Sequence, residues 1–208
     1  LDRCDRVKEC QEEIEFIHAR SAFFSRITSK LEKKIIPYRV THNDTKLSNV
    51  LLDEKTGKAL CLIDLDTVMK GSILYDYGDA LRIGASIAVE DEVDLEKVKI
   101  DLDLVEAFTK GFLSEVKEIL WPSEAEALYD GYHIITCEIA MRFLHDYLEG
   151  DLYFRINRKK HNLERARNQI KLVQEIEKNE KEIKALINKV LKELNYDEKF
   201  FSSNLPKA

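Results

Sequence analysis

The chain has 208 residues, of which 44% are hydrophobic and 35% charged, with a formal net charge of −6. This apolar fraction supports a folded core and excludes wholesale disorder, and no apolar run approaches the ~20 residues that a transmembrane helix needs. The net negative charge, with no basic stripe interleaved with aromatic residues, argues against nucleic acid as the main partner. We therefore expect one folded domain that acts on neither nucleic acid nor membrane.

The cysteines indicate a reducing compartment. They are Cys4, Cys10, Cys61 and Cys137. They show no C-x-x-C spacing and follow no secretory signal, which favours free thiols and a cytoplasmic location. The chain opens with Leu1 and enters a charged amphipathic segment at once, so we expect its start to lie inside a longer protein. The sequence leaves the oligomeric state open.

The first third of the chain predicts a helical region followed by short strands. Apolar residues recur at helical spacing from about Asp5 to Lys33 without an interrupting Pro or Gly, and Pro37 ends this region. Short strands are then predicted at 38–40, 50–52 and 59–63. The last two strands flank a polar connection that contains Gly57, a pattern typical of a β-hairpin.

The rest of the chain is predicted to be helical. The helices are expected at 76–88, 101–118, 123–148 and 163–194, the third with Ser123 as its N-cap. Between 171 and 192, dense mixed charge and apolar residues at helical spacing favour a helix packed on its own domain over a partner-binding coiled coil. Phe200 and Phe201 are expected in a docked or frayed tail. The predicted fold class is mainly α with a small β-hairpin, an α+β fold.

A cluster of polar residues around the hairpin predicts chemistry. Asp44 and Asn49 lie five residues apart in a loop, and Asp64 ends the second hairpin strand, which returns it to the neighbourhood of Asn49. Amide and carboxylate oxygens are good ligands for Mg²⁺, whose coordination sphere is usually completed by phosphate and water. Asp44 would then lie beside the metal, placed to accept a proton from a hydroxyl nucleophile. This arrangement is the one that phosphoryl transfer requires.

Three stretches carry a resemblance to a known family. They are His42-Asn43-Asp44-Thr45-Lys46-Leu47-Ser48-Asn49 with Ile63-Asp64-Leu65-Asp66, Tyr75-Asp76-Tyr77-Gly78-Asp79-Ala80-Leu81-Arg82, and the segment from Arg142 to Phe154. The first resembles the catalytic loop and metal-binding segment of the aminoglycoside phosphotransferase/choline kinase superfamily. All three look like the N-acetylhexosamine 1-kinase type within it, and the likeness runs from about residue 10 to about residue 180.

The resemblance implies a role for each matching residue. Asp44 would be the catalytic base, and His42 would brace the catalytic loop through hydrogen bonds. Asn49 and Asp64 would hold Mg²⁺ and, through it, ATP. Arg142 and Tyr153 match positions that line the sugar pocket, together with Asp44. Asp66 and Asp76 are expected to support the site from behind.

The resemblance also implies the reaction and the domain. The family transfers the γ-phosphate of ATP to the anomeric C1 hydroxyl of N-acetylglucosamine or N-acetylgalactosamine, a small-molecule sugar substrate. Residues 1–208 would form a single C-terminal lobe of a protein-kinase-like fold, with the catalytic loop and hairpin at 38–66 and the helical body at 72–194. The N-terminal ATP-binding lobe would be absent, and no glycine-rich phosphate loop occurs in this sequence. We therefore expect little or no kinase activity from this chain alone.

Several alternatives stay open. Asp64-Leu65-Asp66 also resembles the nucleophile motif of haloacid dehalogenase-type phosphatases, whose fold needs alternating β and α units downstream. A choline or amino-alcohol kinase of the same superfamily is a second possibility, although Arg142 would oppose a cationic substrate. A third is a non-catalytic sugar-binding or regulatory module.

Some of these residues also have purely structural interpretations. Asp76 and Asp79 are expected to begin a helix, where carboxylates favour the helix dipole, with Arg82 as the partner of Asp79. Arg142 and Asp146 lie four residues apart, as a surface ion pair would. Tyr153 and Phe154 could be core aromatics. The remaining histidines, His18, His133, His145 and His161, lack metal-ligand spacing, and no zinc site is proposed.

Overall fold

A computed structural model describes residues 2–196, so the tail with Phe200 and Phe201 lies outside the described part. The α+β fold class is confirmed: helices dominate, and four short strands form two separate antiparallel pairs. The helices are α1 (Gln11–Ala19), α2 (Ser21–Glu32), α3 (Ile73–Gly84), α4 (Leu102–Val116), α5 (Pro122–Ala125), α6 (Leu128–Glu149), α7 (His161–Lys178) and α8 (Glu180–Glu193). The strands are β1 (Arg39–Thr41), β2 (Val50–Leu52), β3 (Ala59–Leu62) and β4 (Met69–Gly71).

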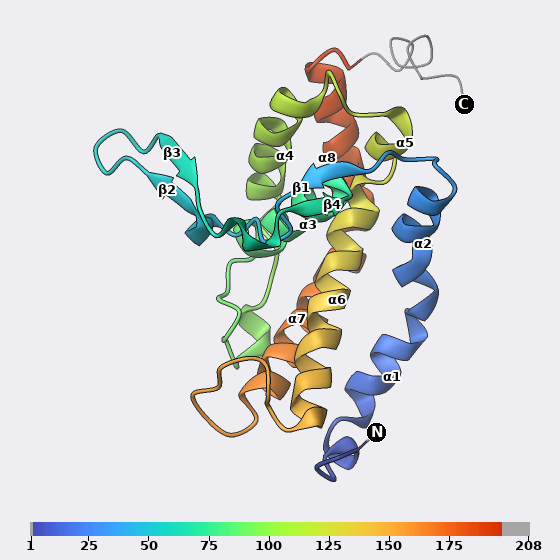
Figure 1. The fold of residues 1–208 in the computed structure, drawn as a ribbon, viewed down its shortest axis with the longest axis vertical. Coiled ribbons are helices and arrows are strands. Elements are labelled where there is room, and N and C mark those ends of the chain that lie inside the picture. Colours follow the sequence, from blue (N-terminus) through green and yellow to red (C-terminus); the bar gives the residue numbers. More distant parts are fainter. Residues whose placement is uncertain (1, 197–208) are drawn as a thin grey trace.

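Helix α6 forms the centre of the body and packs against α3 and α7 (Figure 1). The contact between α3 and α6 is made through glycine. A Cβ on Gly78 would lie 2.4 Å from the backbone oxygen of Gly131, and one on Gly131 would lie 2.4 Å from that of Leu74. No side chain fits at such distances, so the two helices approach backbone to backbone.

Three regions predicted as single helices are each broken into two, and the predicted helix at 123–148 divides into α5 and α6 at Glu126 and Ala127. The first divides into α1 and α2 at Arg20, and the last divides into α7 and α8 at Asn179. The guanidinium of Arg20 donates to both carboxylate oxygens of Glu177 at 2.7 Å and to the backbone oxygen of Phe16 at 3.0 Å. The ion pair with Glu177 joins residues far apart in the sequence and stabilises the break. The periodicity of apolar residues does not predict such a contact.

Two predicted helix starts are wrong by a few residues. Helix α3 begins at Ile73, capped by Ser72, whose hydroxyl accepts the backbone N–H of Leu74 at 3.3 Å. Asp76 therefore lies in the first turn of α3, whereas Asp79 lies beyond it. Ser123 is not an N-cap, because α5 starts at Pro122 and the Ser123 hydroxyl donates to the backbone oxygen of Ile35 at 2.6 Å.

The last helix packs onto its own domain, as predicted. Ile183, Ile187 and Val190 on α8 are buried, and α8 lies against α4. This leaves no apolar seam of α8 free for a coiled-coil partner in the described part of the chain. None of the helices between residues 2 and 196 has the combination of length and apolar character that crossing a membrane requires.

The strands form the predicted hairpin and one further pair. β2 and β3 pair antiparallel with Val50 opposite Leu62, and the hairpin extends away from the helical body (Figure 1). β1 pairs with β4, a three-residue strand that the sequence analysis missed. Beyond β4, residues 72–196 are helical apart from turns and one isolated antiparallel bridge between Ser86 and Ile100. The alternating β and α units of a haloacid dehalogenase-type fold are therefore excluded for this part of the chain.

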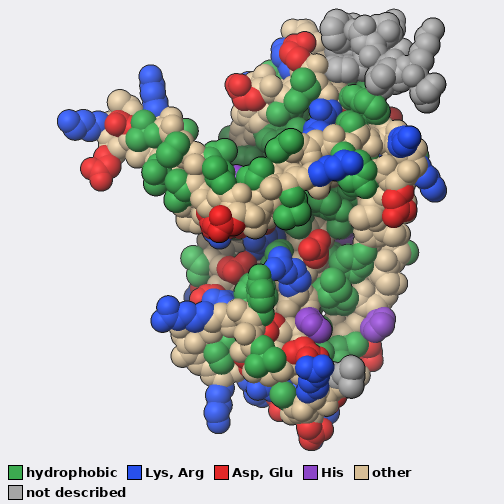
Figure 2. All heavy atoms as spheres, in the orientation of Figure 1, with side chains coloured by type: hydrophobic (Ala, Val, Ile, Leu, Met, Phe, Trp, Pro, Cys, Tyr) green, Lys and Arg blue, Asp and Glu red, His purple; other side chains and the backbone are tan. Residues whose placement is uncertain are grey.

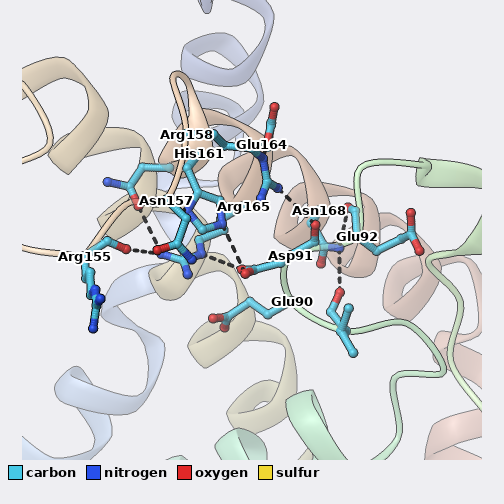
Figure 3. A network of polar contacts seen from close by, with 12 residues as sticks. Glu90, Asp91, Glu92, Arg155, Asn157, Arg158, His161, Glu164, Arg165 and Asn168 are labelled. Atoms are coloured by element: carbon cyan, nitrogen blue, oxygen red, sulfur yellow. Dashed lines mark hydrogen bonds and ion pairs between the residues drawn. The ribbon is translucent and has the colours of Figure 1, made fainter.

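The connection between α3 and α4 is fastened to α7 by a polar network (Figure 3). Asp91 accepts from Arg165 Nε at 2.7 Å and lies 3.1 Å from Nε2 of the fully buried His161. The His161 Nδ1 accepts the backbone N–H of Asn157 at 3.2 Å. Asn168 donates to the backbone oxygens of Val89 and Glu92, both at 3.1 Å. This network holds in place the segment that contains Glu90, a residue that forms an ion pair with Arg82.

Candidate active site

The loop between β1 and β2 carries the predicted catalytic residues, and α3 holds its backbone. The Asp76 carboxylate accepts the backbone N–H groups of His42 and Asn43, both at 2.8 Å. Thr45 Oγ1 donates to the backbone oxygen of Asp76 at 2.8 Å. Burial raises the pKa of Asp76, while the two N–H donors act to lower it. The first turn of α3 thus fixes the start of the loop.

The other side of the loop is held by the segment after β3. The Thr67 hydroxyl donates to the backbone oxygen of His42 at 2.6 Å, and the Asn43 amide donates to the backbone oxygen of Thr67 at 2.9 Å. The His42 ring places Nε2 3.1 Å from the backbone oxygen of Ile63. His42 is buried and its Nδ1 has no partner in the described part of the chain. The ring therefore joins the loop to the end of β3.

A chain of charged contacts connects the loop to the α3–α4 connection. Asp79 accepts the backbone N–H of Thr45 at 3.1 Å, and Arg82 Nε donates to the other oxygen of Asp79 at 3.0 Å. The predicted pairing of Asp79 with Arg82 is confirmed, and both side chains are buried. Arg82 also donates to Glu90 at 2.6 Å and to Gln169 at 3.1 Å. Because the network around Asp91 holds the segment that contains Glu90, it supports the loop indirectly, through Arg82 and Asp79.

Asp44 lies at the centre of the loop and is held by two donors. Lys46 Nζ lies 2.7 Å from its Oδ2, and Asn49 Nδ2 donates to the same oxygen at 2.9 Å. Burial acts to raise the pKa of Asp44, but the hydrogen bonds from Lys46 and Asn49 outweigh it and hold the pKa below its ordinary value. Asp44 is therefore a carboxylate at neutral pH and can accept a hydrogen bond from a hydroxyl group.

Asn49 is joined at the base of the hairpin to Ile63, the residue before Asp64. The backbone N–H of Ile63 donates to the backbone oxygen of Asn49 at 2.9 Å, which brings the end of β3 to the loop. The Asn49 amide nitrogen is occupied by Asp44, while its amide oxygen accepts no hydrogen bond within residues 2–196. Asp64 is exposed and adopts a left-handed conformation, with φ 61° and ψ 53°.

These two oxygen donors fit a magnesium ion that is shared with phosphate. Mg²⁺ typically takes one or two protein carboxylates and fills the rest of its sphere with water and phosphate oxygens. A metal site formed by protein side chains alone would need more ligands than these two. No group of three His, Cys, Asp or Glu side chains in the described residues could hold a metal. The free amide oxygen of Asn49 and the unoccupied carboxylate of Asp64 suit a magnesium ion whose other ligands are water and phosphate oxygens.

The expected supporting role of Asp66 is not what the structure shows. Asp66 is exposed in a short 3-10 turn (Leu65–Thr67) and makes no hydrogen bond to the catalytic loop among the described residues. Its neighbour Thr67 makes those contacts. A threonine that bonds a backbone oxygen 25 positions away leaves no signal in a sequence pattern.

A cavity of about 310 Å³ connects Asp44 to α6. Its polar lining includes Asp44, Asp79, Arg82, Glu138 and Arg142, and its other lining residues are Asn43, Tyr75, Ile135 and Ile139. Figure 2 shows acidic and basic side chains side by side in the hollow of this face, below β1 and β4. The structure therefore brings Arg142 into the same cavity as Asp44. It also adds Glu138, which the sequence analysis did not single out.

Tyr153 lies in a neighbouring groove instead. This groove, of about 430 Å³, shares Arg142 with the cavity and is also lined by His145, Glu149 and Phe154. The Arg142 guanidinium lies 5.8 Å from the ring centre of Tyr153 and 5.6 Å from that of Phe154. Tyr153 is 75% exposed, so it is not a core residue, whereas Phe154 packs on Phe143.

The alternative pairing of Arg142 with Asp146 is wrong. Asp146 is buried and accepts the backbone N–H groups of Leu152, Tyr153 and Phe154 at 2.8–2.9 Å. It closes the turn that follows α6 and leaves Arg142 without a carboxylate partner in the described part of the chain.

A loop carboxylate beside a cavity, with an amide and a carboxylate near the hairpin base whose oxygens fit a metal ion, is compatible with a phosphotransferase of kinase-like fold. A comparison with family models gives the same answer. The phosphotransferase enzyme family matches residues 3–110, slightly more than half of the chain. The chain belongs to this family.

A curated relative supports the assignment over a shorter stretch. The uncharacterized kinase-like protein D1044.1 of Caenorhabditis elegans is 40% identical to this chain over 58 residues. These residues make up 28% of this chain and 15% of that protein, so the match covers a small part of the relative. Neither comparison identifies the acceptor substrate.

Proposed function

We propose that this chain forms the acceptor-binding and catalytic lobe of an ATP- and Mg²⁺-dependent kinase that phosphorylates the anomeric hydroxyl of an N-acetylhexosamine. The observation that supports it most strongly is the cavity shared by Asp44 and Arg142. A carboxylate base and a sugar-binding arginine must meet around one acceptor, and these two come from segments almost one hundred residues apart.

In the proposed reaction, the acceptor oxygen attacks the γ-phosphorus of ATP. The bond between this phosphorus and the oxygen that bridges to the β-phosphate breaks, ADP leaves, and the hydroxyl proton passes to Asp44. An anomeric hydroxyl is more acidic than an ordinary alcohol, so a carboxylate of low pKa is an adequate base. The donors Lys46 and Asn49 keep Asp44 anionic and fix its orientation toward the acceptor.

Asn49 and Asp64 would hold Mg²⁺, which would supply charge neutralisation for the phosphates of ATP. The side chain of Asn49 has a double function in this proposal. Its amide nitrogen donates to Asp44, and its amide oxygen would be free to bind the metal. The loop that carries Asp44 and Asn49 is held by Asp76, Asp79 and Thr67. The base and this metal ligand would therefore keep a fixed separation.

The domain prediction enters the proposal as well. Residues 1–208 would be the C-terminal lobe, and a separate lobe would supply the groups that hold the triphosphate and the adenine. The hairpin side of the site has exposed apolar side chains, including Leu47 (64% exposed), Leu60 (64%) and Leu62 (57%). A second lobe or the nucleotide would cover such a surface, which is costly to leave in water. A cytoplasmic location stays a prediction.

An acceptor panel tests the proposal with the complete protein. ADP release with Mg-ATP is measured with N-acetylglucosamine, N-acetylgalactosamine, choline and no acceptor. We expect acceptor-dependent ADP release with at least one N-acetylhexosamine and none with choline, because Arg142 disfavours a cation in the cavity. Activity with choline alone would show that the acceptor is choline and not a hexosamine. Binding of a hexosamine without turnover would favour a non-catalytic module.

A further inference from the structure

Two opposite charges on α6 line the Asp44 cavity without pairing to each other. Glu138 and Arg142 are four residues apart and therefore lie on the same face of the helix. Such a spacing commonly produces an ion pair. Every residue of α6 is described, and no ion pair joins these two side chains. Both side chains face the cavity with their charges unmatched by a direct contact.

Glu138 is half-buried and has no hydrogen-bond donor within residues 2–196. Burial raises the pKa of Glu138, Arg142 acts to lower it, and Asp79 raises it further. A desolvated carboxylate without a hydrogen-bond donor is unfavourable, and the charge of Arg142 compensates for it only through space. A ligand that donates a hydrogen bond would supply the compensation.

Arg142 is positioned by aromatic rings rather than by a carboxylate. Its guanidinium lies 5.8 Å from the ring centre of Tyr153 and 5.6 Å from that of Phe154. No carboxylate or carbonyl oxygen among the described residues accepts a hydrogen bond from it. Its five N–H donors therefore remain available to a molecule in the cavity.

Each of the other charged side chains that line the cavity has an ion-pair partner, and Arg82 is shared between Asp79 and Glu90. Asp79 pairs with Arg82 at 3.0 Å, and Asp44 pairs with Lys46 at 2.7 Å. The cavity thus offers a ligand one free hydrogen-bond acceptor, Glu138, and one free multiple donor, Arg142. Their formal charges cancel, so the cavity favours an uncharged ligand.

We propose that Glu138 is a specificity-determining residue, which together with Arg142 binds two hydroxyl groups of a neutral polyhydroxylated acceptor. Glu138 accepts from one hydroxyl and Arg142 donates to another. This inference rests on the proposed function and assigns it a recognition chemistry. A cationic acceptor would be repelled by Arg142 and an anionic acceptor by Glu138, so both are disfavoured.

The first test is steady-state kinetics of the complete protein carrying Glu138→Gln or Arg142→Gln. We expect the acceptor KM to rise about tenfold or more in each, because a charge-assisted hydrogen bond is lost, while the KM for ATP stays within about twofold. Glu182→Gln on α8 is the matched control, since Glu182 is exposed and makes no ion pair in the described part of the chain. An unchanged acceptor KM in Glu138→Gln would overturn the inference.

Deoxy analogues identify the hydroxyl that Glu138 binds. The 3-, 4- and 6-deoxy forms of N-acetylglucosamine are compared in the wild type and in Glu138→Gln. One analogue should bind about tenfold more weakly than the parent sugar to the wild type but equally well to the variant, because the same hydrogen bond is already missing. A purely structural role of Glu138 would instead weaken all analogues by a similar factor, and this result would contradict the proposal.

A binding experiment separates failure of this inference from failure of the proposed function. If the complete protein phosphorylates no hexosamine, calorimetric titration with N-acetylglucosamine, choline and glucuronate still tests the cavity. Binding of the neutral sugar alone, weakened in both Glu138→Gln and Arg142→Gln, supports the inference without any catalysis. Preferential binding of choline or glucuronate, or binding of none of the three, overturns it.

Discussion

Asp76 uses one carboxylate to hold two consecutive backbone N–H groups of the catalytic loop. A carboxylate has two oxygens that accept, whereas an amide has one oxygen that accepts and a nitrogen that donates. Asp76→Asn would therefore leave one N–H of the loop facing another donor. Two backbone N–H groups of the loop thus depend on this one side chain.

For Asp76→Asn we expect a loss of about 1–3 kcal/mol in the free energy of unfolding, the usual cost of an unsatisfied buried donor. We also expect kcat to fall by about a hundredfold or more, because Asp44 is displaced. Denaturant unfolding and steady-state kinetics of the complete protein measure both. Asp66→Asn is the control and should change either quantity little, since Asp66 is exposed. Equal effects of the two substitutions would contradict the assignment.

Glu138 should show the cost of keeping an unpaired carboxylate in the cavity. Its pKa is raised in the folded chain by burial, with Asp79 and Arg142 as the charged groups around it. A carboxyl group with a raised folded pKa binds protons more readily when folded, so it reduces stability as the pH rises above its unfolded pKa. Glu138→Gln should then be more stable than the wild type at pH 7 and should lose this advantage below about pH 4. Thermal unfolding at both pH values checks this, and a less stable variant at pH 7 would contradict it.

At the residue scale, sequence reasoning reached the loop and its support Asp76, but it missed other residues around the loop. The spacing from His42 to Asn49 and the strand that ends in Asp64 were sufficient to select the site, because these residues are close in sequence. Thr67 and Glu138 were missed for a physical reason. Each acts through a contact across the fold, and neither belongs to a local pattern.

At the scale of elements, the contact between α3 and α6 determines the distance between the loop and the acceptor residues. α3 carries Asp76 and Asp79, and α6 carries Glu138 and Arg142. Gly78 and Gly131 let these helices approach closely. A β-carbon at either position would meet backbone atoms, which cannot move aside as the end of a side chain can.

Gly78→Ala and Gly131→Ala should each destabilise the fold by about 2–4 kcal/mol, through overpacking and displacement of α3 from α6. Gly111→Ala on α4 is the matched control, because a Cβ there meets nothing within 4 Å. It should raise stability by about 1 kcal/mol, the gain from replacing glycine in a helix. Chemical denaturation compares the three, and a stabilising effect at Gly78 or Gly131 would show that the helices are not in backbone contact.

A second element contact should appear in the pH dependence of stability. Glu177 on α7 pairs with Arg20 and lies 2.9 Å from His133 Nε2. Burial acts to raise the pKa of Glu177, but hydrogen bonds from Arg20 and His133 outweigh it and lower the pKa. Its stabilisation is therefore complete above its unfolded pKa and is lost as the pH falls through the lower folded value.

Glu177→Gln should lower the free energy of unfolding at pH 7 by about 1–3 kcal/mol. Between about pH 5 and pH 3 the wild type should lose stability more steeply than the variant, so the two curves approach each other. Urea unfolding across this range measures the difference. Parallel curves would mean that Glu177 is not held in its charged form by the Arg20 contact.

Helix periodicity predicted which segments are helical but not where they break or begin. The breaks at Arg20 and Asn179 and the early start of α3 depend on partners elsewhere in the fold or on a single cap. The strand β4 escaped prediction because it has three residues and pairs with β1, far from it in sequence. Tertiary contacts override local pattern at these points.

At the scale of the whole molecule, we propose that the chain is one lobe of a two-lobe kinase. The side chains proposed to act on the acceptor are present here, whereas the groups proposed to hold the triphosphate and adenine are expected on another lobe. We expect this chain by itself to release ADP at least about a hundredfold more slowly than the complete protein, since binding and positioning of ATP contribute at least that factor. Steady-state ADP release by the two proteins tests this, and comparable turnover by the chain alone would contradict the division.

The measurement that tests the central claim most directly is phosphorus NMR of the complete protein with Mg-ATP and an N-acetylhexosamine. The account predicts a new sugar 1-phosphate resonance in the wild type, and its loss in Asp44→Asn, which keeps the shape of Asp44 but removes the base. The same resonance appearing at an unchanged rate in Asp44→Asn would contradict the role of Asp44. Intact ATP with both N-acetylglucosamine and N-acetylgalactosamine would contradict the proposed acceptor.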